Sequence, residues 1–436
     1  MKYSTLLAIA LAWFAFALAS SVSHGHDAAP DKSLPNIVMI LSDDQGYGDY
    51  GFMGHQRIET PHLDKLAIER LVITHGYVPS SVCRPSLVSI VTGLYPHQHR
   101  ITSNDPPQVG DKAKRRDLRN EQVAYMDKSP TIPRLLTPLG YQSFQAGKWW
   151  EGHHNRGGFT AGMTHGDANR QGRHGDEGLH IGRQGIAPIR EFLDQTAGDP
   201  FLLWYAPMMP HLPHNPPKRL VAKYRDKAKS KFVAQYFASV EWFDETCGEV
   251  LAELDKRGLA DNTIVVYVTD NGWIQDPKRH HAGERSKLSP YDGGLRTPIM
   301  VRWPGRVMPR RVSTPVSSID IAPTLLEAVG LKPTADMEGI NLLGSNAVAD
   351  RKAIFGETFS HDAVDIHRPS TSLEYRWCVS MPWKLIIPNR ANVPDGKVEL
   401  FNLADDPKEE VDLAEKHPEV VAEMTKKIDE WWAAKD

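Results

Sequence analysis

The sequence predicts an α/β fold with a large, mostly parallel sheet flanked by helices and a small C-terminal antiparallel α+β subdomain. Continuous apolar runs at residues 36–41, 201–206 and 262–269 indicate central strands, because the strands of a parallel sheet are buried on both faces. Segments with helical periodicity, the clearest at residues 231–256, alternate with these runs up to about residue 330, as is typical of α/β domains. The 436 residues, 41% of them hydrophobic, are ample for a large core with a smaller unit beside it.

Beyond residue 345 the pattern changes. Short strand-like pieces occur at residues 353–357, 377–379, 384–387 and 399–402, and an amphipathic helix is expected at residues 418–432. We therefore expect a main domain at residues 34–345 and a C-terminal subdomain at residues 346–436.

The N-terminus has the features of a signal peptide at residues 1–19. Lys2 precedes a short apolar run, and Ala17-Leu18-Ala19 gives a small-x-small cleavage site. The run is too short for a comfortable membrane span, although a retained anchor is the alternative. We expect an exported protein, periplasmic or extracellular, without stable membrane insertion. The net charge of -3 gives no global attraction to nucleic acid.

Three cysteines leave at least one thiol free or in an intermolecular bond, and a Cys247–Cys378 bridge stays open. Cys83 comes just before Pro85 and an apolar helical pattern that stops at Gly93. This places Cys83 at a helix N-terminus, where the pKa of a thiol is lowered. A buried core cysteine is the alternative.

Polar residues follow two of the predicted central strands. Asp43 and Asp44 come after the first strand, and Asp270 and Asn271 come after the strand at residues 262–269. Open α/β sheets bind ligands beyond the carboxyl ends of their strands. Carboxylates together with an amide oxygen suit calcium or magnesium, although each aspartate alone could be a cap or turn residue.

Cationic side chains follow other segments: Lys148, His211 and Lys287. A metal ion, two lysines and a histidine around a helix N-terminus would form an anion site for a phosphate or sulfate group. Each of these cations alone is equally compatible with a solvated surface position.

These residues lie in short motifs that occur in one order from Asn36 to about Asp412. Each motif is weak alone, but the whole series resembles the type I sulfatases, relatives of alkaline phosphatase that use a formylglycine nucleophile. The resemblance implies an alkaline phosphatase-like fold. The motifs include Asp43-Asp44-Gln45-Gly46, Cys83-Arg84-Pro85-Ser86, Gly147-Lys148-Trp149, Pro210-His211, Thr269-Asp270-Asn271-Gly272 and Tyr291-Asp292-Gly293-Gly294-Leu295-Arg296.

The resemblance also implies roles for individual residues. One calcium ion is held by Asp43, Asp44, Asp270 and Asn271, with the modified Cys83 as a further ligand. A formylglycine-generating enzyme would oxidise Cys83, and the hydrated aldehyde would attack sulfur. Lys148 and Lys287 would hold the sulfate oxygens, and His211 would assist the leaving alcohol. The expected substrate is a sulfated small molecule or, preferably, a sulfated carbohydrate, which we expect Arg84, His154 and Arg296 to contact.

Two positions depart from the family pattern. Leu87 stands where the family has the arginine of its nucleophile motif, and Trp150 stands where the family has a histidine. His153 or His154 could supply the missing imidazole from a long loop at residues 151–185. Three functions stay open: a sulfatase with a rearranged site, a sulfatase-fold binding protein without turnover, and a hydrolase of phosphodiesters or phosphonate esters on the same metal site.

Overall fold

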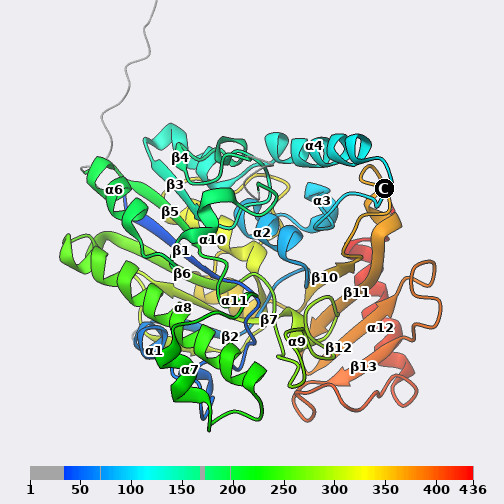
Figure 1. Ribbon diagram of the computed structural model, residues 1–436. Helices are drawn as coiled ribbons and strands as arrows, with labels where there is room; N and C mark the ends of the chain where they lie inside the picture. Colours follow the sequence, from blue (N-terminus) through cyan, green and yellow to red (C-terminus); the bar gives the residue numbers. More distant parts are fainter. Residues whose placement is uncertain (1–33, 69, 167–171, 197, 436) are drawn as a thin grey trace, which may run out of the picture.

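The computed structural model describes residues 34–68, 70–166, 172–196 and 198–435 (Figure 1). The predicted signal peptide at residues 1–19 lies outside the described residues. The chain forms a large sheet with helices on both faces and a smaller sheet beside it, which confirms the predicted fold class.

The centre of the large sheet is β1 (Asn36–Ser42), which lies between β5 (Phe201–Ala206) and β6 (Thr263–Thr269) and runs parallel to both. On the far side of β5, β3 (Gln142–Gly147) is also parallel, and β4 (Ala161–Gly162) extends that edge. The carboxyl ends of β3, β5, β1 and β6 therefore meet along one edge of the sheet.

The other half of the sheet is mixed. Strand β7 (Arg296–Arg302) runs antiparallel to β6 and to β2 (Leu71–Tyr77), and β8 (Arg310–Val312) and β9 (Val316–Ser317) pair in parallel with β2. The predicted sheet is thus mostly parallel, with β7 as the antiparallel strand within it.

Alternate side chains of β1 face two separate hydrophobic clusters. Ile37, Met39 and Leu41 pack in one cluster with α2 (Cys83–Thr92), α5 (Ile132–Leu136) and α10 (Ile321–Ala328). Val38 and Ile40 pack in the other with α1 (Pro61–Ile68), α6 (Ala187–Thr196) and α8 (Lys231–Lys256). The continuous apolar sequence of β1 follows from this burial on both faces. The remaining helices of the main unit are α3 (Pro96–His99), α4 (Lys112–Lys128), α7 (Lys218–Tyr224), α9 (Asp292–Leu295) and α11 (Ser345–Asp350).

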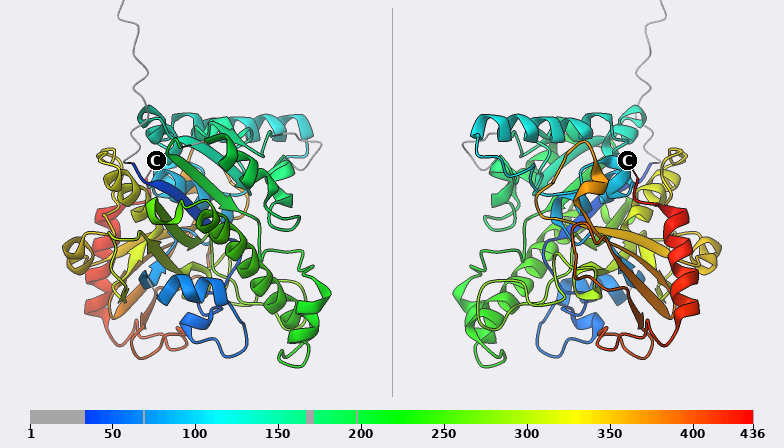
Figure 2. Two further views of the ribbon diagram at one scale, coloured as in Figure 1. Left: turned by 90° about the vertical axis from the view of Figure 1, so that its left-hand side faces the viewer. Right: turned by 90° about the vertical axis from the view of Figure 1, so that its right-hand side faces the viewer.

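The smaller sheet is antiparallel, as predicted, and lies beside the large one (Figure 2). Met424 and Ile428 of the last helix pack against its strands. The elements, in chain order, are β10 (Ile354–Phe359), β11 (Leu373–Ser380), β12 (Trp383–Pro388), β13 (Glu399–Asn402) and α12 (Pro418–Trp431).

All three cysteines are buried and free. Cys247 packs in the α8 cluster and Cys378 packs under α12, so the bridge that the sequence left open is not formed. Within the described ranges, no helix has both the length and the apolar composition needed to cross a membrane.

Candidate active site

The predicted acidic residues meet at the carboxyl edge of the large sheet. The backbone continues the strand ladder past the strand ends, because the Asp43 N–H donates to Met209 O at 2.9 Å and the Asp270 N–H donates to Ser42 O at 2.9 Å. Asp44 has a φ of 58°, a left-handed conformation that aspartate tolerates better than most residues. Its N–H donates to Asp270 Oδ1 at 3.2 Å, which ties the ends of β1 and β6 together.

Both predicted lysines reach these carboxylates. Lys148 Nζ lies 2.7 Å from Asp43 Oδ2 and 3.3 Å from Asp270 Oδ2. Lys287 Nζ lies 2.6 Å from Asp44 Oδ1, and its loop is anchored where the Leu288 N–H donates to Ser81 O at 3.1 Å. The three carboxylates and two lysines form what we call the site cluster: Asp43, Asp44, Asp270, Lys148 and Lys287.

Burial and mutual charge shift the ionisation of this cluster. Burial alone would lower the pKa of Lys148, but Asp43 and the neighbouring acids outweigh it and hold that pKa well above its usual range. Burial alone would raise the pKa of Asp43, but Lys148, His211 and Lys287 outweigh it and lower that pKa. Burial, together with the charge of Asp43, raises the pKa of Asp270. Three carboxylates face two lysines, so one negative charge is left over when all are ionised.

His211 joins the cluster from the segment after β5. Its Nδ1 lies 2.7 Å from Leu212 O, a carbonyl that can only accept, so Nδ1 carries the proton of the neutral ring. The other nitrogen, Nε2, lies 3.4 Å from Asp44 Oδ2. The lone pair of His211 is therefore directed toward the site cluster.

Cys83 is the first residue of α2, and Gly93 ends that helix with a φ of 70°, both as predicted. Atoms of Cys83, Asp43, Asp44 and His211 that can bind a metal all lie within 4.8 Å of one another. The predicted lowering of the thiol pKa is wrong for this structure. Burial raises the pKa of Cys83 to about 12, and the positive charges of Lys148 and Lys287 counteract burial only in part.

The oxygens of this site fit a hard divalent cation. Asp43 Oδ1 and Asn271 Oδ1 are buried and make no hydrogen bond, although buried acceptors are normally paired. Asn271 Nδ2 donates to Asp44 Oδ1 at 2.7 Å, which fixes the direction of its amide oxygen. Carboxylate and amide oxygens are ligands that calcium and magnesium prefer. The predicted ligands Asp43, Asp44, Cys83, Asp270 and Asn271 are thus brought together in one place.

Arg84 points away from this group of oxygens into the protein. It is fully buried, and its Nε and Nη2 donate to the two Glu151 carboxylate oxygens, each at 2.6 Å. Its Nη1 donates to Gln122 Oε1 on α4 at 2.6 Å. The guanidinium is therefore engaged by protein groups and joins α2 to α4 and to the residue after Trp150.

Trp150 and His174 lie beside Lys148. Trp150 is 5% exposed, with its ring centroid 5.9 Å from Lys148 Nζ. The His174 ring meets the Trp150 ring edge-on with centroids 4.5 Å apart, and His174 interacts electrostatically with Lys148, His211 and Asp43. Sequence reasoning did not find His174, because it is one of several histidines in a segment without periodicity. Leu87, which stands where the family pattern has an arginine, is buried in the hydrophobic cluster between α2 and β1.

Two predicted substrate contacts are placed elsewhere. The His154 ring contacts Thr164 O at 3.1 Å, and its electrostatic partners are His153 and His165. Arg296 on β7 donates from Nε to Thr74 O at 3.1 Å, and its guanidinium lies 4.4 Å from the Tyr47 ring centroid. The structure does not bring either side chain to the site cluster, and their role toward substrate stays a prediction.

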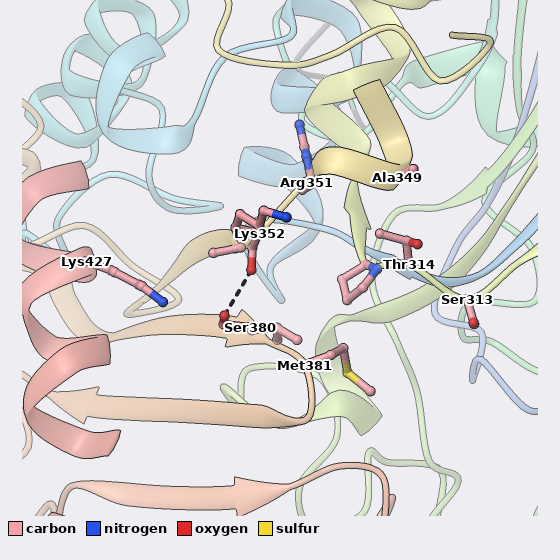
Figure 3. Close-up of a pocket in the computed structure, with 11 residues that line it drawn as sticks. Ser313, Thr314, Ala349, Arg351, Lys352, Ser380, Met381 and Lys427 are labelled. Atoms are coloured by element: carbon pink, nitrogen blue, oxygen red, sulfur yellow. Dashed lines mark hydrogen bonds between the residues drawn. The ribbon is translucent and has the colours of Figure 1, made fainter. Parts of the chain in front are cut away.

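A cavity of about 650 Å³ opens between the two sheets, apart from the site cluster (Figure 3). Lys352, Arg351 and Lys427 line it, and the Lys352 carbonyl accepts a hydrogen bond from Ser380. Arg351 is paired with Asp320 and Lys427 with Glu423, so two of these three cations are already neutralised. The cavity shares no residue with the site cluster.

The edge of the sheet gathers carboxylates, lysines, a histidine and a helix-terminal cysteine, an arrangement that can hold a cation and an anion side by side. Comparison with known protein families gives two matches. The sulfatase family matches residues 35–331, and the family described as N-sulphoglucosamine sulphohydrolase, C-terminal, matches residues 285–434. The chain belongs to the sulfatase family, whose members hydrolyse sulfate esters.

Individual relatives agree. An N-acetylgalactosamine-6-sulfatase from Canis lupus familiaris is 28% identical over 77% of this chain and 70% of its own length. An N-acetylgalactosamine-6-O-sulfatase from Bacteroides thetaiotaomicron is 24% identical over 92% of this chain and 94% of its own. The crystal structure of Ps i-CgsB superposes with a TM-score of 0.73 at 23% identity, covering 92% of this chain and 94% of that one. That likeness shows the shared fold.

Proposed function

We propose that this protein is a calcium-dependent sulfatase that hydrolyses sulfate esters of a carbohydrate, with position 83 as its nucleophile. One observation carries the proposal. Two buried oxygens without hydrogen bonds, of Asp43 and Asn271, lie at the same site as two lysines and Cys83, the first residue of α2. The oxygens suit a cation, and the lysines suit an anion beside it.

Asp43, Asp44, Asp270 and Asn271 would hold the calcium ion. Calcium supplies positive charge that screens the carboxylates from a bound sulfate group, and conversion of Cys83 to formylglycine supplies a hydroxyl nucleophile. When all three carboxylates are ionised, one negative charge of the site cluster is left over, and a bound cation would offset it.

Lys148 and Lys287 hold the anionic group of the substrate. Each is an ammonium with three donors and uses one or two of them on carboxylates, which leaves donors for sulfate oxygens. Lys148 is 1% exposed, and a charge in such a dry position acts more strongly on a developing negative charge than it would in water.

His211 serves the leaving alcohol. Leu212 O fixes the proton at Nδ1, so Nε2 is the nitrogen that exchanges a proton with the substrate. When protonated, His211 donates from Nε2 to the ester oxygen as its bond to sulfur breaks.

A carbohydrate substrate is supported by the relatives. Two of the similar proteins are named for N-acetylgalactosamine-6-sulfate chemistry, and a structural neighbour was solved with neocarrahexaose bound. Export to the periplasm or the exterior goes with this proposal and rests on the N-terminal sequence.

The test combines chemistry at position 83 with a substrate panel. Protein purified from its native host is digested for mass spectrometry of the Cys83 peptide, and sulfate release is measured from sulfated sugars, aryl sulfates and phosphate diesters. We expect an aldehyde at position 83, release of sulfate from sugars, and loss of that release in Cys83→Ala. An unmodified thiol in a protein that cleaves phosphate diesters would overturn the proposal. Tight glycan binding without any turnover would replace it with a binding function.

A further inference from the structure

Three histidines of the segment after Trp150 form a cluster of their own. His153 and His154 lie at the start of a 3-10 helix (His154–Gly157), and His165 follows β4. Each offers a ring nitrogen, and these three atoms all lie within 4.8 Å of one another. The ring centroids are 4.2 Å apart for His153 and His154, and 5.5 and 5.9 Å from these two to His165.

The backbone holds the three rings together. His153 and His165 form an antiparallel bridge, and the His154 N–H donates to Thr164 O at 3.0 Å. Asp176 Oδ2 accepts from the His165 N–H at 2.8 Å. The convergence of the imidazoles therefore comes from defined local structure, and not from long side chains that meet by chance.

The His154 ring is oriented as a metal ligand would be. Its Nδ1 lies 3.1 Å from Thr164 O, so Nδ1 carries the proton and the Nε2 lone pair is left free. Metal-bound histidines commonly donate their other ring N–H to a backbone carbonyl in this way. His154 is 9% exposed, and burial, with help from His153 and His165, lowers its pKa toward the neutral form that binds metals.

The rings of His153 and His165 could bind the same metal ion as His154. The Asn155 N–H donates to His153 Nδ1 at 3.3 Å, a long and therefore weak bond that would break if His153 binds through Nε2 as the neutral ring. His165 is exposed, so solvent can supply a fourth ligand. The ring hydrogen bonds of His153 and His154 go to backbone groups and not to other rings of the cluster.

We propose that His153, His154 and His165 bind a zinc ion, with a water or substrate oxygen as the fourth ligand. Imidazole nitrogen suits zinc and other borderline transition metals, whereas calcium prefers oxygen. This site is thus distinct in chemistry from the oxygen-lined centre at the sheet edge. A zinc ion here would fasten β4 to the 3-10 helix within the segment that follows Trp150.

The experiment titrates zinc into the full-length protein saturated with calcium, so that the oxygen ligands are occupied. Isothermal titration calorimetry should show one zinc ion per chain, and cobalt(II) should give the visible absorption of a four-coordinate site. His165→Ala, at an exposed position, should weaken zinc binding by at least about tenfold. His165→Cys should retain binding, because a thiolate is also a zinc ligand.

His367→Ala is the matched control, since His367 is another exposed histidine outside the cluster. It should bind zinc and cobalt as the wild type does. Equal zinc affinity in His165→Ala and His367→Ala would overturn the proposal, and so would a cobalt complex of the wild type without four-coordinate absorption. Neither result bears on sulfate hydrolysis, which is measured separately.

Discussion

Two buried clusters in this molecule both combine carboxylates with cationic side chains and differ in how completely their charges are paired. In the second, which we call the Lys384 cluster, Lys384 Nζ lies 2.8 Å from Asp292 Oδ1 and 2.7 Å from Glu409 Oε1. Arg296 Nη1 adds a second cation 3.6 Å from Asp292. Two acids thus face two bases. In the site cluster three acids face two bases, and two nearby oxygens are unpaired.

The difference in charge pairing distinguishes a cluster that stabilises the fold from a cluster that binds a ligand. A cluster that only holds the fold together can pair every charge, because an unpaired buried charge is costly. A binding site must keep unpaired groups for its ligand. The two clusters are also linked, because Asp292 begins α9 five residues after Lys287, and its N–H donates to Glu409 Oε2 at 2.7 Å. The C-terminal subdomain thereby fixes the segment that supplies Lys287 to the site.

The largest expected effect comes from breaking the Lys384 cluster. Lys384→Met leaves Asp292 and Glu409 buried with one cation fewer, and we expect the free energy of unfolding to fall by about 3–5 kcal/mol. Urea denaturation at neutral pH measures this. Lys426→Ala, at an exposed lysine paired with Glu430, is the control and should change stability by less than about 1 kcal/mol. Equal stability of Lys384→Met and the control would show that this cluster has no structural role.

In the site cluster, the corresponding lysine substitution should act on turnover. Lys148→Met removes a donor aimed at the developing charge, and we expect kcat to fall about 10²–10³-fold, or roughly 2.7–4 kcal/mol of transition-state stabilisation. Steady-state sulfate release on the best sugar sulfate measures it. With calcium bound, the loss of unfolding free energy should be smaller than in Lys384→Met. A variant that unfolds as easily as Lys384→Met would contradict the division of roles.

Calcium removal tests the unpaired oxygens directly. A ligand at about 100 times its Kd stabilises the folded state by about 2.7 kcal/mol, and a chelator should remove that contribution. We expect Asn271→Leu to abolish the dependence of the unfolding midpoint on calcium, because it removes one unpaired oxygen. Asp292→Asn should be less stable at every calcium concentration and yet keep the full calcium-dependent increment. A calcium effect of equal size in Asn271→Leu would place the ion elsewhere.

The sequence predicted the parts of the fold that depend on local patterns. The buried strands β1, β5 and β6 are continuous apolar runs, and α8 begins and ends where its periodicity does. It did not predict α4, whose sequence is mainly charged and buries only a few side chains. Strands β2 and β7 were also missed; β2 contains Gly76 and β7 contains Pro298, residue types that are uncommon inside strands.

Prediction of the site followed the same division. Residues that come directly after strands were found, because the sheet topology itself brings the strand ends together. Side-chain direction was not predictable: Arg84 turns inward to Glu151, and His174 reaches Trp150 from a segment without a pattern. The thiol pKa of Cys83 was predicted from the helix terminus alone, and burial, which the sequence does not show, is the larger effect.

The smallest expected effect concerns a paired group behind α2. Burial, together with the charge of His97, lowers the pKa of His99 from its usual 6.5 to about 3. Its Nδ1 accepts from the Ile101 N–H at 3.2 Å, and its Nε2 lies 3.1 Å from Ser89 Oγ, so both nitrogens are paired when the ring is neutral. Like the groups of the Lys384 cluster, His99 has protein partners for both its ring nitrogens, but only while its ring is neutral.

Because the folded-state pKa of His99 is depressed, the unfolded chain binds the proton first as the pH falls below 6.5. The contribution of His99 to stability is therefore complete above that pH and declines as the pH falls toward 3, by about 2 kcal/mol at pH 5. Other histidines with lowered pKa values, such as His174 and His214, add to the total. The measurement is thus the difference between wild type and His99→Gln in urea unfolding at pH 7 and pH 5. We expect His99→Gln to lose about 2 kcal/mol less than wild type over this interval, since glutamine does not titrate. The same acid sensitivity in both proteins would mean that His99 is charged in the folded state and that its two hydrogen bonds are made differently.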